Sequence, residues 1–224
     1  MQVEGRREKM WAYRHWEGRF ADMARTEGRI RISAANFYRD IEQTTLQDNM
    51  ELRAIGRIEG PVDITAQSPR SVLNGLLDLG IAIGQDNTKR IQQGGSIHFV
   101  LEAKPCYVFC MSLDRTVGKF DTPGFPPKDK VTFIPDVKEL AEVLVRAAGP
   151  DLLPKYDYGE VKYKDRTYRI GEDRAFPDPF SKPLSFNTDA EVRIVLWPNG
   201  PIQDHLDIQS AEIAALFSVL ELAG

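Results

Sequence analysis

The run CYVFCMS at residues 106–112 constrains the fold more than any other stretch of this chain. Nearly every position in it is apolar, whereas a strand with one face in water alternates apolar and polar residues. The run therefore predicts a central strand covered on both faces. Its cysteines, Cys106 and Cys110, would lie about 13 Å apart along a strand. That separation is too long for a disulfide or a shared metal ion, and it favours buried thiols in a reducing compartment.

The composition is that of a chain able to fold around its own core. The 224 residues are 42% hydrophobic and 28% charged, and they predict a single domain spanning 1–224. The formal charge of −4 argues against general coating of nucleic acid, which requires a strongly basic surface. No stretch approaches the roughly 18 to 20 apolar residues of a membrane span, and the N-terminus lacks the apolar core of a signal peptide. We therefore expect a cytoplasmic protein with no membrane partner.

Periodicity predicts helices and strands in mixed order. Helical spacing of apolar residues predicts helices in the C-terminal tail and at 17–27, 68–80 and 136–148. Gly28 follows the first as a C-terminal cap, and Asp136 with Glu139 forms a capping-box-like pair at the last. The short aromatic-rich run at 10–16 predicts a first strand. Alternation predicts a hairpin within 158–171 and strands at 29–33, 52–58, 191–197 and 206–210, and a further strand at 96–103 is expected beside 106–112. This order predicts an α+β fold with a split, largely antiparallel sheet and peripheral helices.

Polar side chains are dense in the stretch 28–51, which begins with the strand at 29–33. After that strand come the hydroxyl of Ser33, the amide of Asn36, which suits a helix N-cap, and the phenol of Tyr38. Four carboxylates follow, those of Asp40, Glu42, Asp48 and Glu51. Such density suits a binding rim better than a core, and the alternative is a solvated loop.

The strand at 191–197 carries a glutamate at its first position. Alternation places Glu191 and Arg193 on one face and the apolar residues of the strand on the other, in the core. A glutamate at this position can present a fixed carboxylate to a cleft. The alternative is an exposed Glu/Arg pair, which contributes less than about 1 kcal/mol.

The first strand offers a second group of candidates. Tyr13 and His15 share one of its faces and Arg14 lies on the other. The three side chains can hold a nucleotide by stacking and hydrogen bonds, or simply form the rim of the core. No metal site is expected, because His15, His98 and His205 are scattered singly. The chain also lacks the G-x-S-x-G elbow and the G-x-G-x-x-G fingerprint.

These segments together resemble a poorly characterised bacterial family. The resemblance rests on YRHW in the first strand, ISAANFYRDIE after the second, VFCMSLD at the end of the central strand and EVRIV in the late strand. Members of that family often look like toxin or abortive-infection effectors in antiviral defence, and parts of it are similar to the ADP-ribosyltransferase fold. The resemblance implies NAD as substrate and a macromolecular acceptor, protein or nucleic acid. It also leaves room for a neutralising protein partner.

The resemblance assigns roles to three positions, one on each of three strands. The first is Arg14 or His15, the second Ser33 or Tyr38, and the third Glu191. It implies that Glu191 holds the nicotinamide ribose and stabilises the cationic transition state, with Tyr38 and His15 as further catalytic residues. The NAD site it implies is lined by Tyr13, Arg14, His15, Ser33, Asn36 and Tyr38. The chain lacks a Ser-Thr-Ser run and has Asp189 where the clearest transferases have a second glutamate, which argues against arginine as acceptor.

Two other classes of function remain open on the sequence. A metal-dependent nuclease would use Asp40, Glu42, Asp48 and Glu51 as oxygen ligands for Mg²⁺. It predicts activity that disappears with a chelator and survives loss of Glu191. A non-catalytic interaction module, such as a regulator or antagonist in phage-host conflict, would use the same loops as a contact surface. It predicts that no single carboxylate is essential.

Overall fold

The computed structural model describes residues 9–35, 37, 53–68, 70–78, 83, 89–92, 95–121, 126–149, 151–165, 167–169, 178–220 and 222–223. The chain divides into two compact units. Unit 1 contains residues 1–49, 105–162 and 187–224, and unit 2 contains 50–104 and 163–186. Two segments of unit 2 therefore interrupt the chain of unit 1. That the whole chain forms one domain stays a prediction.

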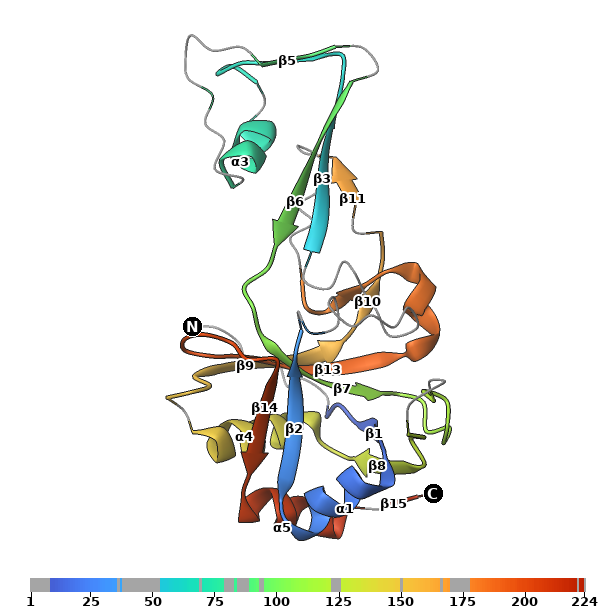
Figure 1. Ribbon diagram of the computed structural model, residues 1–224. Coiled ribbons are helices and arrows are strands. Elements are labelled where there is room, and N and C mark those ends of the chain that lie inside the picture. Colours follow the sequence, from blue (N-terminus) through green and yellow to red (C-terminus); the bar gives the residue numbers. More distant parts are fainter. Residues whose placement is uncertain are drawn as a thin grey trace. The chain divides into compact units, whose positions relative to one another are not determined.

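Unit 1 is built on an eight-stranded sheet with antiparallel strand pairs (Figure 1). Its strands are β1 (Ala12–Trp16), β2 (Arg29–Ala34), β7 (Tyr107–Ser112), β8 (Lys130–Ile134), β9 (Lys155–Glu160), β13 (Glu191–Trp197), β14 (His205–Gln209) and β15 (Leu222–Ala223). One path through it runs β14-β2-β7-β1-β8-β15, and β13 pairs with both β7 and β9. The α+β class and the largely antiparallel sheet predicted from the sequence are confirmed.

The sheet divides at β7, the strand predicted to be central. Strand β13 pairs with one edge of β7 along its whole length, whereas β2 and β1 share the other edge. Ser33 of β2 is opposite Val108, and Tyr13 of β1 is opposite Ser112, so the two strands join β7 at different ends. Away from β7, β2 pairs with β14 and β1 pairs with β8. A split therefore separates β1 from β2 alongside residues 109–111.

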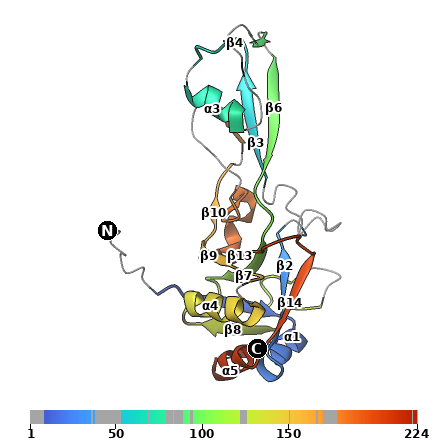
Figure 2. The ribbon, with the colours of Figure 1, turned by 90° about the vertical axis from the view of Figure 1, so that its left-hand side faces the viewer.

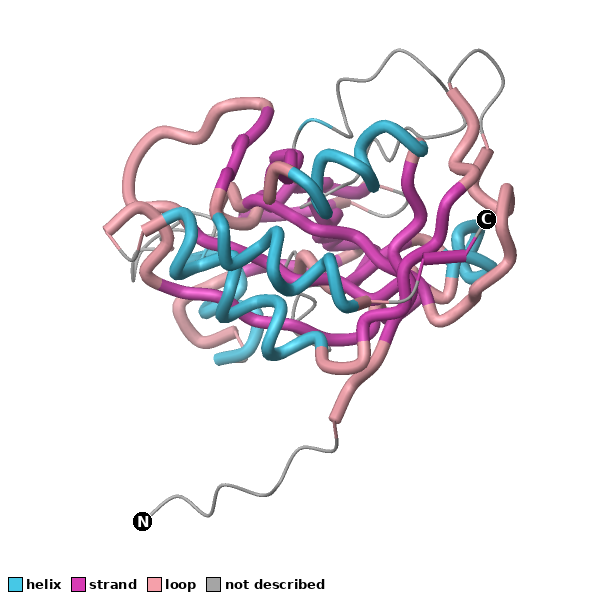
Figure 3. The backbone as a smooth tube through the Cα atoms, turned by 90° about the horizontal axis from the view of Figure 1, so that it is seen from below, coloured by secondary structure: helices cyan, strands magenta, loops and turns pink. Residues whose placement is uncertain are grey.

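Three helices of unit 1 pack on one face of this sheet (Figure 2, Figure 3). They are α1 (Gly18–Thr26), α4 (Val137–Ala148) and α5 (Ala211–Val219). Their buried residues form one core with the apolar face of the strands, in which Val192, Ile194 and Leu196 are completely buried as predicted. Figure 3 shows α1, α4 and α5 overlying the strands when unit 1 is seen from below. The opposite face of the sheet is the one that carries polar residues.

Local signals in the sequence account for the ends of these helices. The Asp136 carboxylate caps α4 by accepting hydrogen bonds from the backbone N–H groups of Lys138 at 3.0 Å and Glu139 at 3.2 Å. Helix α1 ends before Gly28, whose φ of +61° lies in the left-handed region that glycine adopts at helix ends. Both caps confirm the sequence-based predictions.

The described residues of unit 2 form short sheets and the helix α3 (Arg70–Asp78). Strand β3 (Arg53–Glu59) pairs antiparallel with β6 (Ser96–Glu102) and parallel with β11 (Thr167–Arg169). The other described elements of this part of the chain are β4 (Val62–Ile64) paired with β5 (Lys89–Ile91), β10 (Lys162–Tyr163) paired with β12 (Ser181–Lys182), and the 3₁₀-helix Leu184–Asp189.

Two predicted strand pairings are wrong. The segment 158–171 is not a hairpin, because β9 pairs with β13, β10 with β12 and β11 with β3. The strands predicted at 96–103 and 106–112 are not neighbours, since β6 pairs with β3 in unit 2 and β7 belongs to the sheet of unit 1. In both cases the strands pair with segments that are distant in the sequence. Alternation along one segment contains no information about which distant segment it pairs with.

Candidate functional site

A pocket of about 180 Å³ lies where β1 and β2 separate. Its walls come from both strands, from the start of α1 and from the loop before β8. The lining residues are Arg14, His15, Trp16, Glu17, Phe20, Arg29, Ile30, Arg31, Ser33 and Lys128. Trp16 and Ile30 belong to the buried core, whereas His15 and Ser33 lie on the polar face of the sheet, so the pocket reaches through the split.

Arg14 spans the split from β1 to β7. Its guanidinium Nη1 donates a hydrogen bond to the backbone carbonyl oxygen of Cys110. The same guanidinium lies 4.4 Å from the ring centroid of Phe109 and 5.1 Å from that of Trp16, distances typical of cation–π contacts. The side chain is thus fixed on a backbone carbonyl and on two aromatic faces, and its positive charge stays inside the pocket.

His15 is buried, with 7% of its surface exposed. Its Nε2 lies 2.8 Å from the backbone carbonyl oxygen of Asp114, and because a carbonyl only accepts, Nε2 carries the proton. Nδ1 is buried and has no hydrogen-bond partner among the described residues. The ring meets Phe120 edge-on at 4.7 Å. Burial lowers the pKa of His15 below its usual 6.5, so the ring is neutral near pH 7.

The pocket lining has an excess of positive charge. Four of its residues are basic and one, Glu17, is acidic. Glu17 lies 3.2 Å from Arg19, and Arg31 is bound by Asp207 through two hydrogen bonds of 2.9 and 3.0 Å. Burial and the nearby Arg14 lower the pKa of the Lys128 ammonium. The arrangement favours an anionic ligand.

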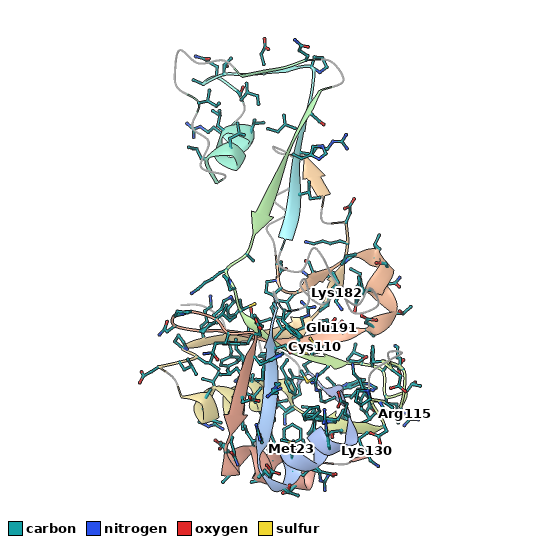
Figure 4. All side chains as sticks on the ribbon, in the orientation of Figure 1. Met23, Cys110, Arg115, Lys130, Lys182 and Glu191 are labelled. Carbon is teal, nitrogen blue, oxygen red and sulfur yellow. The ribbon has the colours of Figure 1, made fainter. Side chains whose placement is uncertain are left out.

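Glu191 lies on the other side of β7, in a buried ion pair. Arg193 Nε donates to Glu191 Oε1 at 2.6 Å, and the side chains are 1% and 6% exposed. Figure 4 shows Glu191 and Cys110 close together on the neighbouring strands β13 and β7. The exposed Glu/Arg pair considered from the sequence is therefore wrong, whereas the predicted placement of both residues on one face is right.

The turn before Glu191 is held by several hydrogen bonds. Ser112 Oγ donates to the Asp189 carbonyl oxygen at 2.7 Å, and the Leu113 N–H donates to the Ala190 carbonyl oxygen at 2.8 Å. Ala190 has a φ of +45°, a conformation that costs a non-glycine residue free energy. The surrounding hydrogen bonds maintain this strained residue, and they fix the direction in which β13 begins.

The register of the strands on either side of β7 shows how far the candidate site residues lie from one another. Tyr13, Ser112 and Glu191 are opposite one another on three adjacent strands, with their side chains on one face. Ser33 shares that face but is opposite Val108, four residues along β7 from Ser112 and therefore about 13 Å away. The polar face thus carries Ser33 at one end and Glu191 at the other.

The pocket brings together three of the residues predicted to bind a cofactor, Arg14, His15 and Ser33. Tyr13 is not among its lining residues and packs instead on Trp11 and Phe133, with ring centroids 5.7 and 5.4 Å away. Asn36 and Tyr38 lie outside the described residues, as do the four carboxylates Asp40, Glu42, Asp48 and Glu51.

No sequence pattern predicted a role for Lys128. It lies within 121–130, a stretch rich in proline that predicts only an exposed connection. It enters the pocket because the strand that follows, β8, pairs with β1. For Arg29 and Arg31 the sequence pattern was weakly informative, since alternation placed them on the face of β2 that does not carry Ile30 and Ile32.

Neither a metal nor a membrane-spanning helix is indicated in the described part of the chain. Its His, Cys, Asp and Glu residues form no group of three or more that could hold a metal ion. No helix in the same residues has the length and apolar character needed to cross a bilayer. Cys106 and Cys110 form no disulfide; Cys106 is buried, as predicted, whereas Cys110 is half-buried, which differs from the prediction.

Comparison with known proteins identifies no relative: no family model, no curated protein and no solved structure matches the chain.

Proposed function

We propose that the protein binds NAD and cleaves its nicotinamide–ribose bond, as an ADP-ribosyltransferase or an NAD glycohydrolase. The observation that carries this proposal is the pocket at the split, which collects Arg14, His15 and Ser33 in a basic lining. The carboxylate of Glu191 lies on the polar face of the same sheet. An anionic dinucleotide suits the charge of the pocket, and a fixed carboxylate suits the charge that develops in this reaction.

The size of the pocket implies that it takes only part of NAD. Pockets that enclose a drug-sized ligand measure roughly 300–1,000 Å³, and this one encloses about 180 Å³. The remainder of the dinucleotide would have to reach along β7 toward Glu191, whose side chain is 6% exposed; Ser33 and Glu191 lie in rows about 13 Å apart. An extended ligand with phosphates in the pocket and nicotinamide ribose near Glu191 fits this separation.

The proposed chemistry uses the Glu191 carboxylate as an electrostatic stabiliser. The bond between C1′ of the ribose and N1 of nicotinamide breaks, and nicotinamide leaves as a neutral ring with the bonding electrons. The ribose becomes oxocarbenium-like, and a carboxylate held by Arg193 at 2.6 Å offsets its positive charge. A nucleophile on the acceptor, or water, then adds to C1′ and loses a proton to solvent. Either product would suit the toxin or defence-type role that the resemblance implies.

The test is calorimetric titration with NAD together with measurement of nicotinamide release. The natural protein should bind NAD and release nicotinamide, whereas Glu191→Gln should bind NAD and release at least about a hundredfold less, the usual effect of losing one transition-state stabilising group. Glu212→Gln is a matched control, because Glu212 lies in an exposed ion pair with Arg146. Its activity should be that of the natural protein.

Two results would contradict the proposal. The first is absence of NAD binding by the natural protein at millimolar concentration. The second is equal nicotinamide release by the natural protein and a folded Glu191→Gln variant. Folding is checked by urea unfolding followed through tryptophan fluorescence, because Trp11, Trp16 and Trp197 all belong to unit 1.

A further inference from the structure

We propose that Lys119 is a positioning residue: it holds the turn that precedes β13 and thereby sets the place of the Glu191 carboxylate. The turn consists of Thr188, Asp189 and Ala190 and is called the 188–190 turn below. The effect on catalysis rests on the proposed function, whereas the contact between Lys119 and the turn does not. Lys119 lies in the loop after β7, and no sequence pattern predicted a role for it.

All three carbonyl groups of the 188–190 turn accept hydrogen bonds from the segment 112–119. The ammonium of Lys119 donates to the first of them, the carbonyl oxygen of Thr188, at 2.6 Å. The other two accept from the hydroxyl of Ser112 and from the backbone N–H of Leu113, at 2.7 and 2.8 Å. Two donors thus lie at the end of β7, and Lys119 supplies the third from the loop that follows.

These hydrogen bonds matter because the turn contains a strained residue. Ala190 has a φ of +45°, and a non-glycine residue stays in this region only where its surroundings hold it there. Glu191 is the next residue and the first of β13. Relaxation of Ala190 would therefore change the direction in which β13 begins and move the carboxylate.

The ammonium of Lys119 is itself held in place by Asp114. Its Nζ donates to Oδ2 of that carboxylate at 2.8 Å, and the Thr116 N–H donates to Oδ1 at 2.8 Å. The hydrogen bonds from Lys119 and Thr116 keep the pKa of the Asp114 carboxyl well below its usual range, so the carboxylate stays charged near pH 7. A residue that positions a reacting group must have a fixed position of its own, and Asp114 gives one to Lys119.

The same loop also holds His15 in the pocket at the split. His15 Nε2 donates to the carbonyl oxygen of Asp114 at 2.8 Å, and its ring meets Phe120 edge-on at 4.7 Å. The Lys119 ammonium lies 5.4 Å from the centroid of the Phe120 ring, a distance typical of a cation–π contact. The segment 112–120 therefore connects the pocket with the 188–190 turn, the two parts of the site that the proposed NAD cleavage uses.

The first measurement is amide hydrogen exchange, which requires no ligand. The Leu113 N–H donates to the Ala190 carbonyl oxygen, so its exchange rate reports local opening of the turn. Lys119→Met should raise this rate at least about tenfold, as expected for loss of one charge-assisted hydrogen bond. Lys119→Arg retains a cationic donor and should exchange at nearly the natural rate. The Asn199 N–H, bonded to the Leu152 carbonyl oxygen at 2.9 Å after the far end of β13, should exchange equally in every variant.

The second measurement is the steady-state rate of nicotinamide release. Lys119→Met should lower kcat at least about tenfold, because a small misplacement of a reacting group is costly. KM for NAD should stay within about twofold of the natural value, and Lys119→Arg should restore most of kcat. General loss of folded protein would instead raise the Asn199 exchange rate as well.

Lys138→Met is the matched control for both measurements. Lys138 also forms an ion pair, with Glu142 at 3.5 Å, but it is exposed on α4, which packs on the other face of the sheet. Its replacement should change neither the Leu113 exchange rate nor kcat.

Failure of this inference and failure of the proposed function give different results. An unchanged Leu113 exchange rate in Lys119→Met overturns the inference, and so does a faster rate with unchanged kcat. Neither result affects the enzyme class, because the natural protein still releases nicotinamide. Faster exchange in Lys119→Met, together with a natural protein that releases no nicotinamide, supports the hold of Lys119 on the turn and contradicts the proposed function.

Discussion

Arg193 Nε lies 2.6 Å from Glu191 Oε1, and the two side chains are 1% and 6% exposed. They are two residues apart on β13, so both project from the same face of the strand. Because both side chains are buried, water cannot solvate either charge unless the strand moves. The pair therefore couples the candidate catalytic carboxylate to the stability of the whole unit.

Replacing one member of this pair should be far more harmful than replacing both. Arg193→Met leaves a buried carboxylate without its guanidinium and should lower the free energy of unfolding by about 3–5 kcal/mol. The double variant Glu191→Gln, Arg193→Met should lose much less, because no buried charge remains. Urea unfolding followed by tryptophan fluorescence measures both.

Arg146→Met provides the control for this prediction. Arg146 pairs with Glu212 at 2.5 Å, but the side chains are 55% and 44% exposed. Arg146→Met should lower the free energy of unfolding by less than about 1 kcal/mol. If Arg193→Met were no more harmful than Arg146→Met, the buried pair would not support the sheet in the way its geometry implies.

Gly28 and Gly149 should respond differently to alanine. Both have positive φ, +61° and +91°, so each substitution forces alanine into a left-handed conformation that costs about 1–2 kcal/mol. A Cβ on Gly28 would also lie 1.9 Å from the backbone oxygen of Ser210, whereas one on Gly149 would meet nothing within 4 Å. Gly28→Ala should therefore lower the free energy of unfolding by more than about 2 kcal/mol, and Gly149→Ala should lower it by no more than about 2 kcal/mol. Equal losses in urea unfolding would contradict the tight packing of Gly28 on α5.

Stability should fall as the pH drops below about 6.5, the ordinary pKa of histidine, in part because of His15. Burial lowers the pKa of the folded His15; Arg14 and Lys128 act in the same direction, and the Asp114 carbonyl and carboxylate act against it. The unfolded chain therefore binds more protons between the lowered pKa and the ordinary one, and protons favour unfolding in that window. The loss is complete once the pH has passed below the folded pKa.

The check is the free energy of unfolding at pH 7 and at pH 5. His15→Gln can still donate to the Asp114 carbonyl but does not titrate, so it should show a smaller difference between the two values than the natural protein. An unchanged difference in His15→Gln would show that His15 is not the titrating group.

Asp136 should stabilise the folded protein only by capping α4. Its Oδ1 accepts from two backbone N–H groups at the start of α4, so Asp136→Ala should lower the free energy of unfolding by about 1 kcal/mol. Asp136→Asn keeps a capping oxygen and should lose little. Equal losses of unfolding free energy in Asp136→Asn and Asp136→Ala would mean that the carboxylate acts through its ion pair with Lys9, 3.8 Å away, and not as a cap.

The features predicted correctly from the sequence are those determined by neighbouring residues. The cap at Asp136, the glycine after α1 and the alternation of β13 each depend on a few adjacent side chains. The apolar run 106–112 also identified the central strand, because a strand covered on both faces has no polar side.

The features that were missed depend on pairing between distant segments. Alternation placed Glu191 and Arg193 on one face but could not show that this face is covered, so their burial was not predicted. Lys128 enters the pocket only through the pairing of β8 with β1, about a hundred residues apart in sequence. The pocket therefore contains residues of β1 and β2 that the sequence analysis had singled out, together with a loop residue that it had not.

The chain between β2 and β7 contains the first segment of unit 2, and the position at which it leaves the sheet bears on how its length can vary. The Ala35 N–H donates to the Cys106 carbonyl oxygen at 2.8 Å, and Ala34 is opposite Tyr107, so the chain departs and returns at hydrogen-bonded neighbours of one antiparallel ladder. A tight hairpin turn could join β2 to β7 with the same register. The chain between them is thus inserted at a hairpin tip, a position where lengthening, exchange or loss of a segment leaves the strands on either side in place. Unit 1 can in this way keep its split sheet while descendants of the sequence acquire different inserts.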